Sequence, residues 1–239
     1  MKLAFIKEQL TNEKFRKELL KVVDDVDALI PQSEAEFNNL LKFGLYSADD
    51  CVPFVTRQKT PFYHLDNMSV IDIHKTDDWM VYGDFRFRQL EVLYHMPRMK
   101  TPEAHEWLRN NLFQERVDAR KKTEYKAKFR GQEREDWKEI QSEWMKYCLN
   151  LKYKQHPLFR KDLKAVGNRL PVEDATNTNY SSNLFWGGAL VEVDGEKYYF
   201  GCNVLGKLLK ALRATNGKLE YSLPSDFHIF GKPILPLDQ

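Results

Sequence analysis

Apolar residues recur at helical spacing through the first 45 positions of the chain, with a break at Pro31. Ser33 and Glu36, three positions apart, have the form of a capping box ahead of the second apolar stretch. Gly44 follows that stretch, and glycine commonly ends helices. The pattern predicts two helices over residues 1–45.

A second helical region lies in the middle of the chain. Thr101 stands where an N-cap is expected, and the spacing predicts a long helix over about 102–128. Gly131 interrupts it, and a further helix is expected over about 133–151. One face of this further helix is expected to be buried, since it carries at helical spacing Trp137, Ile140, Trp144, Tyr147 and Cys148.

A short helix is expected over about 157–166, and strand patterns follow Leu170. The stretches LFWGGALVEV and KYYFG are joined by Asp194-Gly195. An Asp-Gly pair between apolar runs is a strong hairpin signal, since both central residues of a type I′ turn need positive φ. Helix returns at Val204, and farther upstream the alternation over 69–74 is typical of a short strand.

Together these elements predict a mainly α fold of the α+β class with a small antiparallel β-hairpin. A chain of 239 residues, 42% hydrophobic and 30% charged, can hold one large domain with an N-terminal extension. No apolar run approaches the ~20 residues that cross a bilayer, and charges interrupt the N-terminus where a signal peptide needs an apolar stretch. We therefore expect a soluble, cytoplasmic protein with no membrane segment.

Cysteine spacing and net charge exclude further classes. Cys51, Cys148 and Cys202 lie far apart and lack the Cys-x-x-Cys spacing of zinc and redox sites, so reduced thiols are expected. The formal net charge of +2 is well short of the strongly basic balance of an obligate nucleic-acid binder. Nucleic acid stays open as a partner.

Metal and cofactor sites find no support in the motifs. His105-Glu106 begins like the His-Glu-x-x-His zinc helix, but Arg109 stands where the second ligand belongs. The other histidines are scattered. The sequence has no Gly-x-Gly-x-x-Gly or Walker loop and no nucleophile elbow. We expect no metal and no cofactor.

Carboxylates and indoles remain as candidate chemistry. Breaking an N-glycosidic bond builds positive charge on the sugar, which a carboxylate can stabilise, while an aromatic face can hold the leaving base. Trp137, Trp186, Glu173 and Asp174 are residues of these kinds. Trp137 also fits a role in the core, because Trp144 lies seven positions later on the same face.

Two glycine-rich stretches stand beside these residues. Gly187 and Gly188 follow Trp186 and would let a ligand approach the backbone closely, although a strand bulge explains them equally. The turn GCNVLG precedes a helix, whose N-terminus is a natural site for phosphate. The alternative is that Asn203 simply caps that helix.

The order and spacing of these residues resemble the NADAR or YbiA-like superfamily of N-glycosidases, which act on ADP-ribose-type and related nucleotide compounds. The resemblance covers about 82–213. It is carried by Ala127-Lys128, Gly131, Trp137 with Met145, Lys152-Tyr153 with Gln155, Val172-Glu173, Trp186-Gly187, the run from Asn203 to Gly206, and Arg213.

The resemblance implies a helical YbiA-like domain over 81–239, preceded by a helical extension over 1–80. It also implies a pocket in which Trp137 and acids surround the ribose. Asn183 stands where the family usually has Asp, so the acid role passes to Glu173 or Asp174. The upstream Ser-x-Glu-His motif has its nearest equivalent at 101–106, where the acid is Glu103 or Glu106.

The implied activity is hydrolysis of an N-glycosidic bond in an ADP-ribosylated base or related ribosyl nucleotide, either as a small molecule or within nucleic acid. Lys152 is a possible phosphate contact, and Trp186, Gly187 and Asn203 would bind substrate. Two alternatives stay open. One is a glycosylase that flips bases out of DNA or RNA, using the basic run over 116–134. The other is a non-catalytic member that binds ADP-ribose or a partner, as Asn183 would suggest. The leaving base and the oligomeric state are left open by the sequence.

Overall fold

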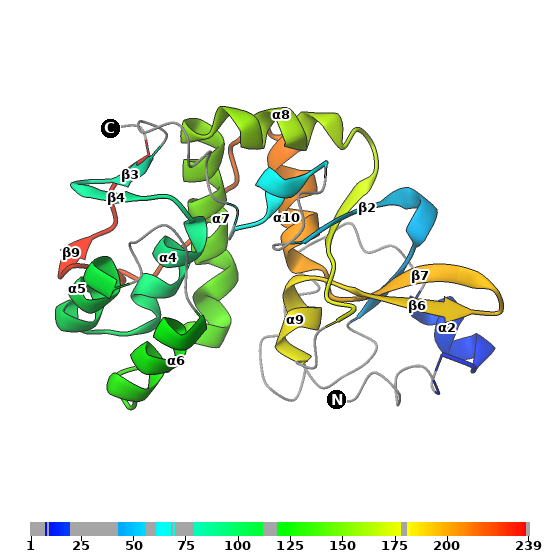
Figure 1. Ribbon diagram of the computed structural model, residues 1–239, viewed down its shortest axis with the longest axis horizontal. Helices are drawn as coiled ribbons and strands as arrows, with labels where there is room; N and C mark the ends of the chain where they lie inside the picture. The colour runs from blue at the N-terminus through cyan, green and yellow to red at the C-terminus, as the bar shows by residue number, and fades with distance from the viewer. Residues whose placement is uncertain are drawn as a thin grey trace. The chain divides into compact units, whose positions relative to one another are not determined.

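A computed structural model describes residues 8, 10–19, 43–55, 61–67, 69, 79–111, 119–177 and 181–237 (Figure 1). The chain forms two compact units, each built from two separate segments. The sheet unit consists of Met1–Tyr63 and Asp162–Ala214, and the helical unit consists of His64–Lys161 and Thr215–Gln239.

The sheet unit holds the longer strands. Its described elements are α2 (Glu13–Leu19), β1 (Gly44–Ser47), the 3-10 turn η3 (Ala48–Asp50), β2 (Cys51–Phe54), β5 (Leu170–Glu173), α9 (Ser181–Trp186), β6 (Ala189–Val193), β7 (Glu196–Gly201) and α10 (Val204–Ala214). The strand order of its larger sheet is β1-β7-β6, all antiparallel, while β2 pairs with β5 in parallel. Helix α10 packs on β5.

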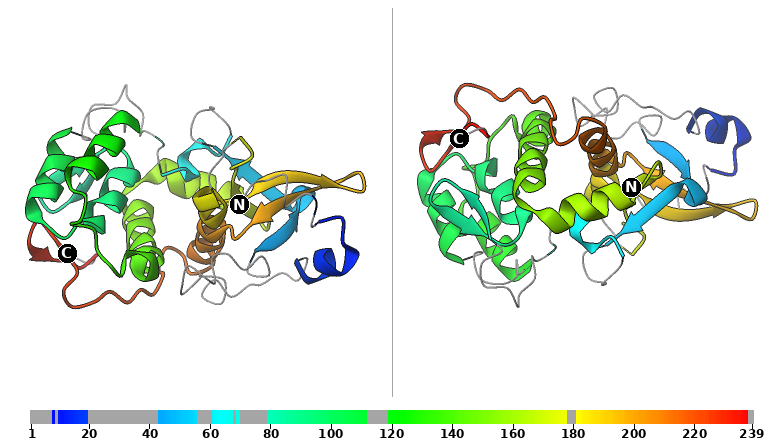
Figure 2. Two further views of the ribbon diagram at one scale, coloured as in Figure 1. Left: turned by 90° about the horizontal axis from the view of Figure 1, so that it is seen from below. Right: turned by 90° about the horizontal axis from the view of Figure 1, so that it is seen from above.

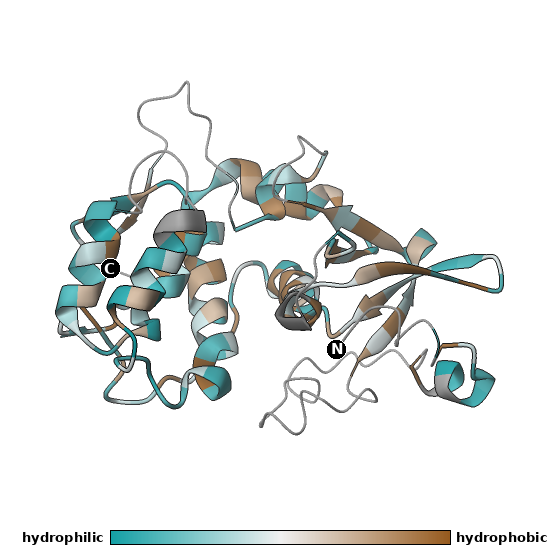
Figure 3. Cartoon of the chain, turned by 60° about the horizontal axis from the view of Figure 1, so that its bottom comes forward, coloured by the Kyte–Doolittle hydropathy of each residue, from teal (hydrophilic) through white to brown (hydrophobic). Residues whose placement is uncertain are grey.

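The predicted hairpin is confirmed in β6 and β7. Asp194 and Gly195 form its tip with φ angles of 54° and 83°, the positive values that a type I′ turn requires. Figure 3 shows apolar residues along the two strands and polar residues at the tip.

Two predictions about this unit were wrong in detail. Gly44 was expected to end a helix, but it begins β1 and pairs with Gly201, because the apolar residues beside it enter the core. Leu184 to Trp186 were expected in a strand but belong to α9. The carbonyl of Leu184 there accepts the N–H of Cys202 at 2.7 Å, which satisfies an acceptor at the helix end. Most of the second predicted helix, and residues 70–74 of the predicted upstream strand, lie outside the described residues.

The helical unit is built around one long helix. Its described elements are β3 (Met80–Tyr82), β4 (Phe85–Phe87), α4 (Leu90–His95), the 3-10 turn η5 (Met96–Arg98), α5 (Pro102–Asn111), α6 (Ala119–Lys128), α7 (Trp137–Gln155), β8 (His228–Ile229) and β9 (Lys232–Pro233). The 3-10 turn η4 (Tyr63–Leu65) and helix α8 (Pro157–Ala165) carry the chain between the two units. The packing of α4 on α7 can be followed in Figure 2.

The buried face predicted for α7 is confirmed, since all five of its residues are at most 8% exposed. The predicted start near Glu133 was four residues early, because the N–H of Arg134 instead donates to the carbonyl of Arg98 at 2.9 Å. The long helix predicted over 102–128 is described as α5 and α6, and residues 112–118 lie outside the description.

The α+β class expected from the sequence is confirmed. The domain boundary predicted near residue 80 stays a prediction. The boundaries between the two compact units fall in the sequence after Tyr63, Lys161 and Ala214. No helix in the described part of the chain is both long and apolar enough to cross a membrane.

Candidate functional site

The two tryptophans of α7 have different surroundings. Trp144 is fully buried, and its indole N–H points at the carbonyl oxygens of Leu93 and Tyr94, at 3.3 and 3.2 Å. Trp137, the first residue of α7, is 8% exposed, and its ring packs against that of Tyr94 with centroids 5.5 Å apart. Among the described residues, no hydrogen bond is found to the indole N–H of Trp137.

A carboxylate lies on the same short helix as Tyr94. Glu91 belongs to α4, and its Oε1 lies 2.9 Å from Nε2 of His95 and 2.5 Å from Nζ of Lys122. The three side chains are 16%, 15% and 24% exposed, so the cluster is shielded but still reaches the surface. Helix α4 thus carries Tyr94 of the aromatic pair as well as Glu91 and His95 of this cluster.

The charge state of Glu91 follows from its neighbours. Burial would raise the pKa of its carboxyl group, but the cation of Lys122 and the ring of His95 outweigh burial and hold this pKa below its ordinary value. Burial lowers the pKa of His95, against the opposing effect of Glu91. At neutral pH the structure thus holds an ionised carboxylate beside a neutral imidazole.

Two adjacent residues, Asp66 and Asn67, connect this cluster to the C-terminal half of α7. The carbonyl of Asn67 accepts the N–H of Glu91 at 3.1 Å, and the amide of Asn67 approaches the sulfur of Met145 at 3.4 Å. The neighbouring carbonyl of Asp66 accepts a hydrogen bond from Nζ of Lys152 at 2.8 Å. Met145 and Lys152, both part of the sequence resemblance, thereby support the backbone at Glu91.

The upstream acids predicted from the sequence lie elsewhere on the same unit. Glu103 and Glu106 are both exposed on α5, whose inward face holds Ala104, His105 and Leu108. Glu106 lies 3.7 Å from the guanidinium of Arg109. Their predicted catalytic role stays a prediction.

The second predicted acid pair lies in the sheet unit, at the end of β5. Glu173 and Asp174 are both half-buried. Oδ1 of Asp174 accepts hydrogen bonds from the backbone N–H of Thr176, at 2.9 Å, and from its hydroxyl group. That hydroxyl in turn accepts the N–H of Leu190 at 2.8 Å. Asp174 therefore stabilises the turn that holds β6.

The glycine after Trp186 is explained by the protein's own backbone. A Cβ on Gly187 would lie 2.0 Å from the carbonyl oxygen of Glu173, so only glycine permits this contact. The N–H of Gly188 donates to the same carbonyl at 2.9 Å. Trp186 is half-buried and packs edge-on against Phe185, with ring centroids 4.9 Å apart. Gly187 thus holds Trp186 and Glu173 in neighbouring positions.

Asn203 completes this group. Its N–H donates to the carbonyl of Gly187 at 3.2 Å, and its side-chain amide donates to the carbonyl of Pro171 at 2.9 Å. It is fully buried, has a φ of 49°, and its Oδ1 makes no hydrogen bond within the described part of the chain. Asn203 is therefore not a side-chain cap of α10, and its amide instead fastens α10 to β5.

The predicted residues are thus gathered in two groups. Glu173, Trp186, Gly187 and Asn203 lie together in the sheet unit, whereas Trp137 and Lys152 lie in the helical unit with Glu91. Among the described residues, no three His, Cys, Asp or Glu side chains are grouped as metal ligands would be.

Sequence reasoning missed the Glu91 cluster. Glu91 and His95 are four positions apart, a spacing that places both on one side of a helix, and this was the available signal. Lys122 could not have been found in this way, because it comes from another helix 31 positions later.

Comparison with known proteins agrees with the resemblance. The chain matches the NADAR domain over residues 53–215. No curated protein matches the chain. The match spans most of the chain and includes β5, the turn at Asn203 and the whole of α7, so the chain belongs to the NADAR domain family.

Proposed function

We propose that this protein is an N-glycosidase that hydrolyses the bond between ribose and a base in an ADP-ribosylated base or related ribosyl nucleotide. The observation that carries the proposal is the ionised, shielded carboxylate of Glu91, one helical turn from the Tyr94–Trp137 aromatic pair. Membership of the NADAR domain family supports it.

The arrangement fits the charges of this reaction. As the bond from C1′ to the base nitrogen breaks, its electron pair leaves with the base and positive charge develops on the ribose. A carboxylate that stays ionised stabilises that charge, and Lys122 and His95 keep Glu91 in this form. Water then adds its oxygen to C1′, and its proton goes to the departing base. The indole of Trp137 offers a face on which the base can stack.

The residues of the sheet unit keep the roles proposed from the sequence. Glu173 or Asp174 is proposed as a catalytic carboxylate, and Trp186, Gly187 and Asn203 are proposed to bind substrate. Lys152 remains a proposed phosphate contact. Lys152 is 1% exposed, and its ammonium already donates to the carbonyl of Asp66, which supports a further role in holding the backbone next to Asn67.

Turnover of a panel of N-ribosyl compounds tests the proposal. The panel would contain ADP-ribosylated guanosine, the same nucleoside within a single-stranded oligonucleotide, and a phosphorylated ribosylamine, with the released base measured by chromatography. We expect Glu91→Gln to lower turnover by roughly a hundredfold or more, since the amide keeps the shape but loses the charge. Glu139→Gln, an exposed acid on α7, is the matched control and should be unaffected.

The alternatives make different predictions in the same assay. A non-catalytic binder would bind ADP-ribose without releasing base from any compound. A base-flipping glycosylase would act on the oligonucleotide and leave the free nucleosides intact. Full activity of Glu91→Gln would show that the proposed carboxylate is not the one that acts.

A further inference from the structure

The segment Asn216–Leu237 follows the region matched to the NADAR domain and contacts α7 within the helical unit. Leu219 exchanges two hydrogen bonds with the side chain of Asn150, at 2.8 and 2.9 Å. Farther on, the N–H of Ser222 donates to the carboxylate of Glu143 at 2.7 Å. Between Leu219 and Asp226 these contacts move toward the N-terminal end of α7, which carries Trp137. Farther on, the carbonyls of Leu235 and Leu237 accept hydrogen bonds from Tyr147 and Lys154 of the same helix.

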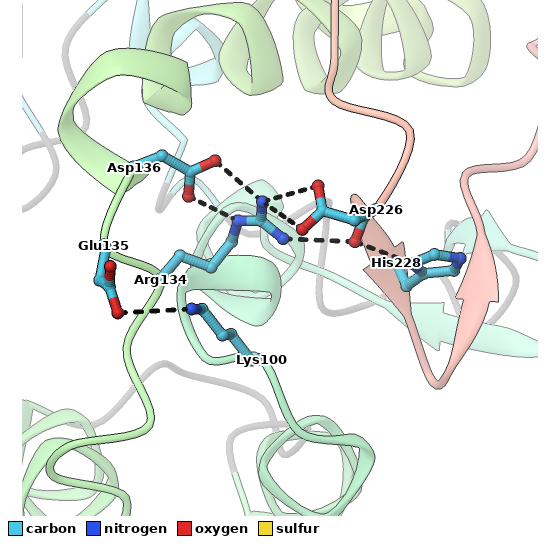
Figure 4. A network of polar contacts seen from close by, with 6 residues as sticks. All are labelled: Lys100, Arg134, Glu135, Asp136, Asp226 and His228. Atoms are coloured by element: carbon cyan, nitrogen blue, oxygen red, sulfur yellow. Dashed lines mark hydrogen bonds and ion pairs between the residues drawn. The ribbon is translucent and has the colours of Figure 1, made fainter.

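Asp226 of the segment binds Arg134, whose guanidinium bridges the two carboxylates of Asp136 and Asp226 (Figure 4). The guanidinium of Arg134 donates two hydrogen bonds to the carboxylate of Asp136, both at 2.9 Å. It also donates to Asp226, through the carboxylate at 3.2 and 3.3 Å and through the backbone carbonyl at 3.4 Å. The side chain of Arg134 is only 6% exposed, and its guanidinium lies over the ring of Phe227. The exposed side chain of Asp226 thereby holds the buried guanidinium of Arg134 in place.

This bridge reaches Trp137 through the backbone. Asp136 is the N-cap residue of α7, and its carboxylate binds Arg134 rather than the first turn of the helix. The N–H of Trp137 donates to the carbonyl of Arg134 at 3.3 Å. The side chain and the backbone of Arg134 therefore both act on the turn in which the indole of Trp137 is set against Tyr94.

We propose that Asp226 is a positioning residue, which holds Trp137 in place through Arg134 and makes the segment after the NADAR match part of the working site. The functional half of this inference rests on the proposed function, whereas the structural half does not. The side chain of Asp226 is 73% exposed, and ion pairs with an exposed partner contribute little to global stability. Removing it should therefore displace Trp137 without unfolding the protein.

The test compares Asp226→Ala, Asp226→Asn and Glu135→Gln in the full chain. Glu135→Gln is the matched control, because it removes a neighbouring surface carboxylate that pairs with Lys100, at 3.9 Å (Figure 4). Among the described residues, the guanidinium of Arg134 binds Asp136 and Asp226 and not Glu135. The position of Trp137 is read by fluorine NMR of protein labelled with fluorotryptophan, and its resonance is assigned by its loss in Trp137→Phe. ADP-ribose is the ligand added to the labelled protein.

We expect Asp226→Ala to shift or broaden the Trp137 resonance and to lower kcat by roughly 10- to 100-fold with little change in KM, since small misplacements near the reacting atoms have effects of this size. The melting temperature should change little. Asp226→Asn keeps an oxygen acceptor for Arg134 and should retain most of the activity, and Glu135→Gln should match the unsubstituted protein.

An unchanged Trp137 resonance in Asp226→Ala would overturn the proposal, and so would an equal effect of Glu135→Gln. A large fall in melting temperature would also overturn it, because Asp226 would then support the whole fold. If the unsubstituted protein turns over no compound of the panel, the proposed function fails. In that case the positioning role is decided by the Trp137 resonance alone, compared between Asp226→Ala and the unsubstituted protein with and without ADP-ribose.

Discussion

Replacing each tryptophan of α7 by phenylalanine should separate the site from the core. Trp144→Phe removes an N–H donor from two buried carbonyl oxygens, which costs about 1–3 kcal/mol when an acceptor is left unpaired. It also leaves a gap in the stack on Tyr147, where the ring centroids are 4.8 Å apart. A total loss of about 2–4 kcal/mol corresponds to a fall in Tm of roughly 5–15 °C for a chain of this length.

Trp137→Phe should behave in the opposite way. The smaller ring can still pack against Tyr94, and no hydrogen bond to the Trp137 indole is lost among the described residues, so Tm should fall by no more than about 3 °C. Turnover of the best N-ribosyl substrate should fall roughly tenfold, because a smaller face holds the leaving base less well. Calorimetry and turnover would be measured on the same preparations. An equal loss of Tm in the two variants would refute the reasoning, because Trp137 would then be a core residue like Trp144.

Three further outcomes are expected. The free energy of unfolding should decline as pH falls below about 6.5. Burial, with the cation of Lys152, lowers the pKa of His156 to about 3, so between these pH values only the unfolded chain takes up a proton at this residue. His156→Gln should therefore reduce the dependence of unfolding free energy on pH by up to about 1.4 kcal/mol per pH unit in urea titrations. Gly206→Ala should severely destabilise the protein in thermal melts, since its Cβ would lie 1.9 Å from the carbonyl oxygen of Pro171. Gly131→Ala is the control: its Cβ would meet no atom within 4 Å, and its positive φ should lower the free energy of unfolding by only about 1–2 kcal/mol. Activity should persist in a chelator, and its loss with recovery on adding a divalent ion would contradict the carboxylate mechanism.

The features that could be predicted from the sequence are local ones. The spacing of apolar residues identified the buried face of α7, because a helix repeats its faces every three to four positions. The pair Asp194-Gly195 identified the hairpin, since few residues other than Asp, Asn and Gly accept the φ angles of its turn. In both cases the physical cause lies within a few residues of the signal.

The features that were missed depend on distant partners. Gly44 begins a strand because Gly201 lies opposite it, and nothing near residue 44 reports that pairing. Gly187 was interpreted as an approach for a ligand or a bulge, but the carbonyl of Glu173 fills the space beside it. Lys122 fixes the charge of Glu91 across 31 positions of sequence. Such pairs are set by the tertiary fold, so spacing alone does not reveal them.

The periodicity of α7 could not by itself distinguish a core indole from a site indole, because both lie on its buried face. The distinction comes from the indole N–H. Trp144 is surrounded on all sides and its N–H has carbonyl acceptors, so the residue is complete without a ligand. Trp137 is almost as buried, yet no hydrogen bond to its N–H is found among the described residues, which favours the proposed role of Trp137 in binding a ring. The proposed role of Trp137 therefore rests on hydrogen bonding, which only the tertiary structure displays, and not on burial, which the sequence pattern already predicted.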